Sequence, residues 1–143
     1  MTFSLGIVGA GQFSGQFAAL FQAHPGVGDV HVTDLLPERA EQLAAAQGLA
    51  GTFPSYQAML ESEAVDAVAV FTQRWTHGPL VLQGLNAGKH VYSAVPMAIT
   101  TDEIADLAVE ADDGAAAQQD AMFRVDRRLA FEMAHCGCFG HLG

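Results

Sequence analysis

The chain has 143 residues, with 6 Lys and Arg against 16 Asp and Glu, which gives a formal net charge of −10. This length suits a single domain with its own core. The scarcity of basic residues excludes nucleic acid and anionic lipid as expected partners, since both need clustered Lys and Arg. Residues 1–28 carry no Lys, Arg, Asp or Glu, and the apolar runs are too short for a membrane span. We expect no signal peptide and no membrane association.

The two cysteines, Cys136 and Cys138, are too few and too close together for a disulfide framework, which favours a reducing, cytoplasmic setting. His135 and His141 lie beside them and give the segment a superficial likeness to a metal site. The spacing matches no strong zinc pattern, so no metal site is predicted.

Short apolar runs alternate with helical patterns along the chain. Strands are predicted at residues 3–8, 30–33, 49–53, 65–71 and 89–92, and helices at 13–24, 37–47, 56–61, 78–87 and 101–112. Ser55 and a Thr100-Thr101-Asp102-Glu103 capping box mark two of the helix starts, and Gly48 marks a helix end. This alternation predicts an α/β fold, a doubly wound parallel sheet of Rossmann type.

The last part of the chain is less regular. A sixth strand is predicted near residues 115–123, a helix at 124–134 and a glycine-rich end at 136–143. We therefore predict one Rossmann domain over residues 1–122, with a C-terminal helix and a poorly defined tail over residues 123–143.

A glycine-rich turn, Gly9-Ala10-Gly11-Gln12-Phe13-Ser14-Gly15, follows the first strand and leads directly into a helix. Gly9 allows a tight turn, and Gly11 lets the backbone approach a pyrophosphate, which the amides at the helix start then bind. Ser14 occupies the position of the usual third glycine. The alternative is that these glycines serve packing only.

Asp34 ends the second predicted strand, where this fold presents a carboxylate to the adenosine ribose. A 2′-phosphate there would meet a like charge, and the following Leu35 and Leu36 offer no cation, although Arg39 lies within a turn or two. We therefore predict NAD as the cofactor, with NADP less favoured. The alternative is a solvated turn aspartate.

Together these residues resemble the Gfo/Idh/MocA oxidoreductases over about residues 4–112. The likeness rests on Leu5-Gly-Ile-Val-Gly-Ala-Gly11, on Asp34 with Pro37-Glu-Arg-Ala40, and on Tyr56-Gln-Ala-Met-Leu60, Val65-Asp-Ala-Val68 and Ala87-Gly-Lys-His-Val91. The resemblance implies an NAD(P)-binding domain. In the family a larger C-terminal α/β domain follows, with the substrate site and usually the oligomer interface, and sugars, cyclitols and related polyols are oxidised or reduced. The present chain is expected to be the first domain without the second.

Thr72-Gln-Arg-Trp-Thr-His77 falls where the family has Thr-Pro-Asn-x-x-His. Thr72 and His77 match this pattern, whereas Gln73 and Arg74 depart from it. The resemblance implies that this loop contacts the cofactor, and Thr72, Gln73 and His77 are assigned to that contact. His77 is equally interpreted as a helix N-terminal cap. Trp75 could stack on a ring or pack against a partner domain.

Ser93-Ala94-Val95-Pro96 falls where the family has Glu-Lys-Pro. Pro96 matches and is assigned to the cofactor site. Val95 replaces the lysine that assists proton transfer in the family, and valine has no proton to give. Lys89 begins its strand at the opposite end, so no catalytic residue is assigned.

The leading hypothesis is an NAD-binding oxidoreductase domain that serves hydride transfer with a sugar- or polyol-like substrate in the full-length type. The alternative is a non-catalytic sensor that passes NAD occupancy to a partner. S-adenosylmethionine binding is a third, less favoured reading of the same turn. Apolar surface around Trp75, residues 95–99 and the C-terminal helix predicts a homo-oligomer or an aggregation-prone monomer.

Overall fold

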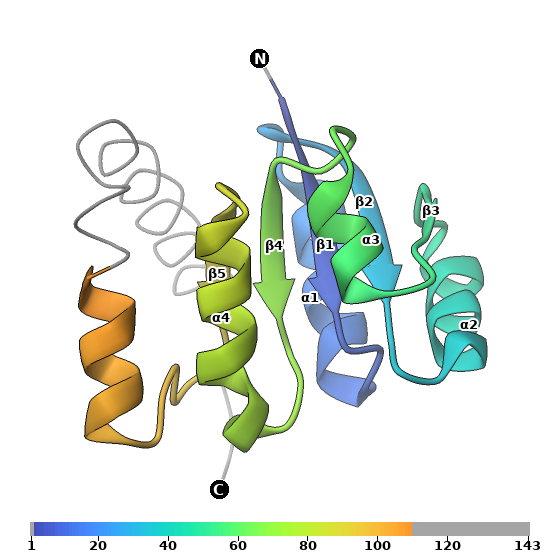
Figure 1. Cartoon of the computed structure of the whole chain (residues 1–143). Coiled ribbons are helices and arrows are strands. Elements are labelled where there is room, and N and C mark those ends of the chain that lie inside the picture. The colour runs from blue at the N-terminus through green and yellow to red at the C-terminus, as the bar shows by residue number, and fades with distance from the viewer. Residues whose placement is uncertain (1, 110–143) are drawn as a thin grey trace, which may run out of the picture.

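The computed structural model describes residues 2–109, and within them one sheet of five parallel strands runs in the order β3-β2-β1-β4-β5 (Figure 1). The strands are β1 (Phe3–Val8), β2 (Val27–Thr33), β3 (Gly51–Thr52), β4 (Ala67–Val70) and β5 (His90–Ser93). The helices are α1 (Gln12–Ala23), α2 (Pro37–Gln47), α3 (Tyr56–Glu61) and α4 (His77–Asn86), with a 3-10 turn η1 (Arg74–Thr76) and a helical stretch at residues 101–109. The predicted Rossmann-type fold is confirmed.

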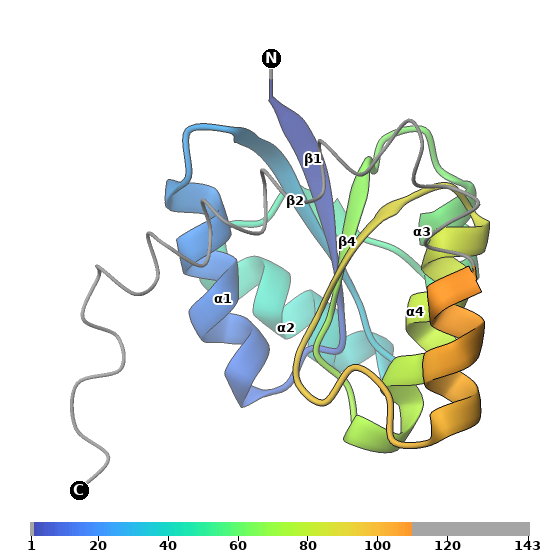
Figure 2. The same ribbon diagram turned by 90° about the vertical axis from the view of Figure 1, so that its left-hand side faces the viewer.

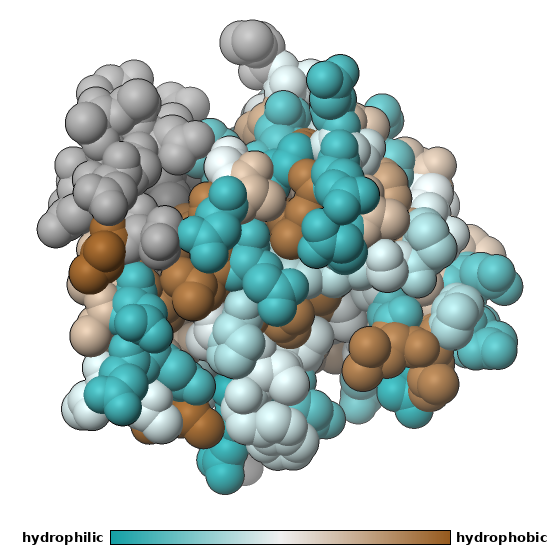
Figure 3. All heavy atoms as spheres, in the orientation of Figure 1, coloured by the Kyte–Doolittle hydropathy of each residue, from teal (hydrophilic) through white to brown (hydrophobic). Residues whose placement is uncertain are grey.

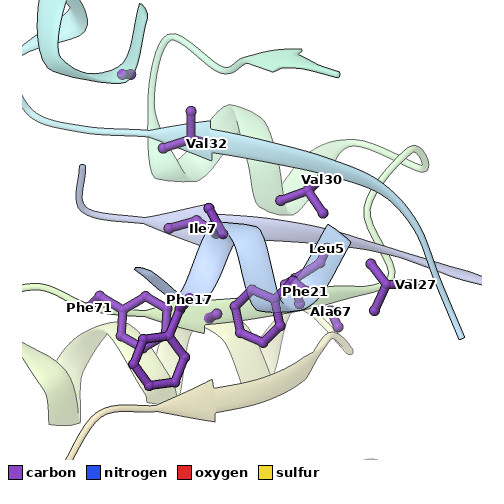
Figure 4. Close-up of a cluster of buried hydrophobic side chains, with 12 residues drawn as sticks. Leu5, Ile7, Phe17, Phe21, Val27, Val30, Val32, Ala67 and Phe71 are labelled. Carbon is purple, nitrogen blue, oxygen red and sulfur yellow. The ribbon is translucent and has the colours of Figure 1, made fainter. Parts of the chain in front are cut away.

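Helices cover both faces of the sheet, as Figure 2 shows. On the face of α1 and α2, helix and strand side chains form one apolar cluster that includes Leu5, Ile7, Phe17, Phe21 and Phe71 (Figure 4). On the face of α3, α4 and residues 101–109, a second cluster includes Met59, Leu60, Val68, Val81 and Leu107. All four residues of β4 are buried. Burial on both faces is why these strands appear in the sequence as continuous apolar runs.

The helix ends follow the predicted capping residues. The Ser55 hydroxyl accepts a hydrogen bond from the Ala58 amide at 3.1 Å at the start of α3. Gly48 ends α2 in the left-handed conformation, with φ 65°. The Thr100 hydroxyl accepts from the Glu103 amide, while the Glu103 carboxylate accepts from the Thr100 amide. These bonds satisfy amides that a helix start leaves without partners, and the predicted capping box is confirmed.

Four of the five strands differ in their bounds from the predicted ones. β4 spans residues 67–70 rather than 65–71, and β5 spans 90–93 rather than 89–92. β2 begins at Val27 rather than Val30, because Val27 pairs with Phe3 of β1 even though the exposed Gly28 and Asp29 interrupt the apolar run. β3 is shorter than predicted and pairs along β2 only through residues 51 and 52. The predicted strand at 115–123, the predicted helix at 124–134, and Cys136 and Cys138 lie outside the described residues.

The chain order creates a switch point between β1 and β4. From β1 the chain moves outward to β2 and β3, and then returns to the other side of β1 with β4 and β5. The connections that leave β1 and β4 therefore run in opposite directions at the carboxyl edge of the sheet, where open α/β sheets bind their ligands. Among the helices of residues 2–109, none is long and apolar enough to cross a membrane.

Candidate functional site

The turn after β1 passes between the ends of two neighbouring strands. The Gly9 amide donates to the carbonyl of Thr33 at the end of β2, at 2.9 Å. Gly9 has φ +96°, and a Cβ there would lie 2.7 Å from the backbone oxygen of Phe71, just beyond β4. Glycine alone suits both this conformation and this close approach. The first glycine of the motif is therefore needed by the fold itself.

The second glycine has different surroundings. Gly11 is the N-cap of α1, in extended conformation with φ −79° and ψ 178°, and no side chain caps the helix there. A Cβ on Gly11 would meet no atom within 4 Å. The next two residues, Gln12 and Phe13, are exposed. The first turn of α1 therefore offers backbone amides beside open space, an arrangement that binds anions.

Ser14, at the usual third glycine position, is completely buried. Its hydroxyl donates a hydrogen bond to the carbonyl oxygen of Gly9. The sequence predicted that a small residue would let helix and strand approach. It did not reveal the hydrogen bond, for which the only sign in the sequence was serine's hydroxymethyl group in place of glycine's hydrogen atom. Ser14 therefore fixes the turn as well as fitting beneath it.

Asp34 is tied to this turn by its side chain. One carboxylate oxygen accepts from the Ala10 amide at 2.7 Å, and the other accepts from the Leu36 amide at 2.8 Å. Leu35 is fully exposed, and Figure 3 shows an apolar patch over the connection between β2 and α2. Arg39 is exposed in the first turn of α2. The structure thus brings Asp34 to the glycine turn, and it describes no comparable contact for the Arg39 side chain.

Hydrogen bonds from two of its own threonines stabilise the connection after β4. The Thr76 hydroxyl donates to the carbonyl of Gln73, and the hydroxyls of Thr72 and Thr76 lie 2.7 Å apart. Since the Thr76 proton is directed at Gln73, Thr72 is the donor between the two hydroxyls. Gln73 and Trp75 are exposed. The sequence singled out Thr72 and Gln73 but missed the bracing by Thr76.

His77, the first residue of α4, lies almost wholly inside the protein with 2% of its surface exposed. Its Nε2 is 3.0 Å from the carbonyl oxygen of Thr72, and its Nδ1 is 2.7 Å from that of Pro96. The N-cap of α4 is Thr76, and no side chain caps that helix. The interpretation of His77 as a cap is therefore wrong, because its ring contacts carbonyls rather than the amides of a helix start.

Val95 and Lys89 lie at opposite edges of the sheet. Val95 is 89% exposed and precedes Pro96 through a cis peptide bond, after β5. The Lys89 ammonium, before β5, donates to the carbonyls of Ser62 and Val65 at 2.8 and 2.7 Å. Lys89 therefore does not replace the family lysine. Within residues 2–109 no cluster of three potential metal ligands occurs, and the segment with Cys136 and Cys138 lies outside that range.

Comparison with known proteins gives one consistent family. Residues 3–121 match the GFO_IDH_MocA family model, an oxidoreductase family with an NAD-binding Rossmann fold. A glycosyl hydrolase family 109 protein of Shewanella pealeana is 26% identical over 99% of this chain and 34% of its own length. Trans-1,2-dihydrobenzene-1,2-diol dehydrogenase of Oryctolagus cuniculus is 31% identical over 73% of this chain and 32% of its own length.

Solved structures agree with this assignment. An NAD-binding protein from Listeria innocua matches with a TM-score of 0.70 and 33% identity, over 80% of this chain and 33% of that chain. The present chain therefore spans about a third of the length of the proteins that it matches. The family match also favours a dinucleotide over S-adenosylmethionine at the glycine turn. The chain belongs to the Gfo/Idh/MocA oxidoreductase family, and it comprises the NAD-binding Rossmann domain of that family.

Proposed function

We propose that the glycine turn after β1 holds the pyrophosphate of NAD(H), through Gly9, Ala10, Gly11, Gln12 and Phe13. The observation that carries this proposal is the contrast between its two glycines. A Cβ on Gly9 would lie 2.7 Å from the Phe71 backbone oxygen, whereas a Cβ on Gly11 would have no atom within 4 Å. Packing does not account for a glycine at Gly11, because no neighbour crowds it. Open space at the start of an uncapped helix instead suits the binding of an anion.

Asp34 binds the adenosine ribose and favours NAD over NADP. Its carboxylate is fixed by two backbone amides, and its charge disfavours a 2′-phosphate placed beside it. Leu35 and Leu36 give that phosphate no cationic partner. Arg39, exposed in the first turn of α2, is the nearest cation in sequence, and we assign it to the outer rim of the ribose site.

The nicotinamide half lies toward the connections after β4 and β5, on the other side of the switch point. Thr72, Gln73, His77 and Pro96 form that part of the site, since the two connections are held together at the carboxyl edge. When bound, the nicotinamide supplies the hydride donor or acceptor. The chain's own residues orient the cofactor. Val95 is exposed, and a substrate approaches the cofactor at this surface.

In its full-length type, a protein with this domain acts on a sugar- or polyol-like substrate. Two observations support this class: one relative is named a glycosyl hydrolase and another a dihydrodiol dehydrogenase. Val95 provides no acid or base, so proton transfer would need a group at another position. We further propose that the Rossmann domain extends over residues 1–122 and that the protein works in the cytoplasm, on the ground of its sparse cysteines.

A titration of the 143-residue chain with NADH and NADPH tests the cofactor proposal. NADH binding is expected, with NADPH weaker. Gly11→Val fills the open space beside the turn and lowers NADH affinity roughly ten- to hundredfold without unfolding the chain, because its φ and ψ suit valine. Gly15→Ala is the matched control, since its Cβ makes only an ordinary contact with Leu43 at 3.6 Å.

Two outcomes contradict the cofactor proposal. One is that a folded wild-type chain binds neither dinucleotide at millimolar concentration. The other is that Gly11→Val binds NADH as tightly as Gly15→Ala does. Either result would leave the turn with a packing role alone.

A non-catalytic NAD sensor is the second candidate, and Val95 favours it, because an aliphatic side chain stands where the family has its lysine. Steady NAD-dependent turnover of sugars or inositols by the full-length protein would exclude the sensor. Tight NAD binding by the same protein, without turnover of any of them, would favour it.

A further inference from the structure

The His77 ring spans the two connections that leave β4 and β5. Its two nitrogens lie 3.0 Å from the Thr72 carbonyl oxygen and 2.7 Å from the Pro96 carbonyl oxygen, and the ring is buried. Thr72 and Pro96 are 24 residues apart in sequence, and both lie at the carboxyl edge of the sheet. The sheet pairs β4 with β5, but it does not pair the connections that follow them. The His77 side chain therefore fixes the distance between these two connections.

The ring has no nitrogen left for a ligand. Both neighbours are carbonyls, which only accept hydrogen bonds, so a neutral ring donates to one of them and a protonated ring donates to both. In either form the ring is buried, so it would not touch a dinucleotide that lies on the surface, as we propose. Any effect of His77 on binding must therefore pass through Thr72, Pro96 or both.

The two connections differ in how they are held. The connection after β4 has its own hydroxyl bonds from Thr72 and Thr76. The connection after β5 is exposed at Val95, Pro96 and Met97, and the Glu103 carboxylate holds its far end through the Ile99 amide at 2.8 Å. The His77 bond to Pro96 thus supports the middle of the more exposed connection.

We propose that His77 is a positioning residue for the nicotinamide half of the site, acting through the carbonyls of Thr72 and Pro96. This inference rests on the proposed NAD function. The adenosine half depends on Asp34 and the turn after β1, which are fixed by other bonds, to Ala10, Leu36 and Gly9. Loss of the His77 ring should therefore weaken the hold on the nicotinamide half and spare the adenosine half.

The test compares two ligands on the 143-residue chain by calorimetric titration: NAD⁺, and ADP-ribose, which lacks the nicotinamide. In the wild type, NAD⁺ should bind more tightly than ADP-ribose. His77→Phe removes both ring nitrogens, and with them any hydrogen bond to the two carbonyls, and should lower NAD⁺ affinity about tenfold, while ADP-ribose affinity stays within about twofold. The measured quantity is the ratio of the two dissociation constants, which does not depend on turnover.

Two conservative variants separate the two bonds and guard against a folding defect. The Asn amide nitrogen falls near the position of His Nδ1, so His77→Asn should keep the Pro96 bond. The Gln amide nitrogen falls near that of Nε2, so His77→Gln should keep the Thr72 bond. Partial recovery of the NAD⁺ to ADP-ribose ratio in at least one of them is expected, and recovery in neither would contradict the role of the two carbonyls.

Lys89→Met is the matched control. The Lys89 ammonium also joins two backbone carbonyls, those of Ser62 and Val65, but at the amino edge of the sheet. Its loss should lower stability and leave the ligand ratio unchanged. If Lys89→Met shifts the ratio as His77→Phe does, or if His77→Phe weakens both ligands equally, His77 is only a general packing residue and the inference is wrong.

The wild-type titrations separate this inference from the proposed function. If the folded wild type binds neither ligand, the proposed function is wrong and the inference falls with it. If the wild type binds NAD⁺ and ADP-ribose equally well, dinucleotide binding stands, but the nicotinamide half is not held and the inference is overturned.

Discussion

The Asp34 carboxylate accepts a hydrogen bond from the backbone amide of Ala10 at 2.7 Å, which joins the end of β2 to the glycine turn after β1. Its second oxygen accepts from the Leu36 amide at 2.8 Å. A carboxylate oxygen can accept more than one hydrogen bond, so each still has a lone pair for a ribose hydroxyl. One side chain therefore both shapes the turn and remains able to recognise the sugar beside it.

Asp34→Asn tests this double role. The asparagine oxygen can replace only one acceptor, and its NH₂ group then faces the other backbone amide. NADH affinity should fall roughly ten- to hundredfold, and the free energy of unfolding should fall by about 1 kcal/mol. Calorimetric titration and urea unfolding measure the two effects. Asp29→Asn, an exposed change within the same strand, is the control and should alter neither. Unchanged binding in Asp34→Asn would contradict the assignment of Asp34 to the ribose.

The first glycine of the turn gives a prediction about stability. Gly9→Ala combines a positive φ with a Cβ placed 2.7 Å from the Phe71 backbone oxygen. Gly48→Ala has a positive φ of +65° but no atom within 4 Å of its Cβ. Gly48→Ala should cost about 1 kcal/mol of unfolding free energy, and Gly9→Ala should cost about 1–3 kcal/mol more because of the collision. Equal losses of unfolding free energy in the two variants would show that the close approach to the Phe71 backbone does not add to the cost of Gly9→Ala.

Much of the fold could be predicted because its signals are local. The apolar run of β4 and the caps at Ser55 and Thr100 depend on residues close together in sequence, and the structure confirms them. β2 was predicted too short, because the pairing of Val27 with Phe3 depends on a distant strand rather than on the polarity of Gly28 and Asp29.

The sequence could predict which residues belong to the candidate site, but not the hydrogen bonds between them. The sequence singled out Asp34 and His77, but it could not show that the Asp34 carboxylate bonds the Ala10 amide or that His77 joins Thr72 to Pro96. These bonds connect positions 5 to 24 residues apart. They depend on how the connections at the carboxyl edge are brought together by the sheet, and no local pattern encodes that arrangement.

The apolar surface near the connection after β5 predicts self-association. Trp75, Val95, Met97 and Ile99 have exposed fractions of 59%, 89%, 43% and 52%. The 143-residue chain should therefore sediment as a dimer or larger species at high concentration. Val95→Ser combined with Ile99→Ser should shift it toward the monomer, whereas Leu35→Ser, at a fully exposed position on the β2–α2 connection, should not. A wild-type chain that stays monomeric at all concentrations would contradict this expectation.

Tyr56 predicts an alkaline dependence of stability. Its hydroxyl donates to the Leu80 carbonyl at 2.8 Å, and burial raises the pKa of the phenol in the folded chain. The unfolded phenol titrates at about pH 10, so above that pH the unfolded state loses a proton that the folded state keeps. The stability that Tyr56 contributes is therefore fully present below about pH 10 and is lost as the pH rises toward the folded pKa.

Tyr56→Phe is the variant that reveals this dependence. Near neutral pH it should be less stable than the wild type by about 1 kcal/mol, because the part-buried hydrogen bond from the Tyr56 hydroxyl to the Leu80 carbonyl is lost. At about pH 10.5 the difference should be smaller, since phenylalanine has no proton to lose. Urea unfolding at both pH values measures the difference, and Tyr92 is present in both proteins, so its own titration cancels. A difference that stays constant between the two pH values would show that burial does not hold the Tyr56 proton.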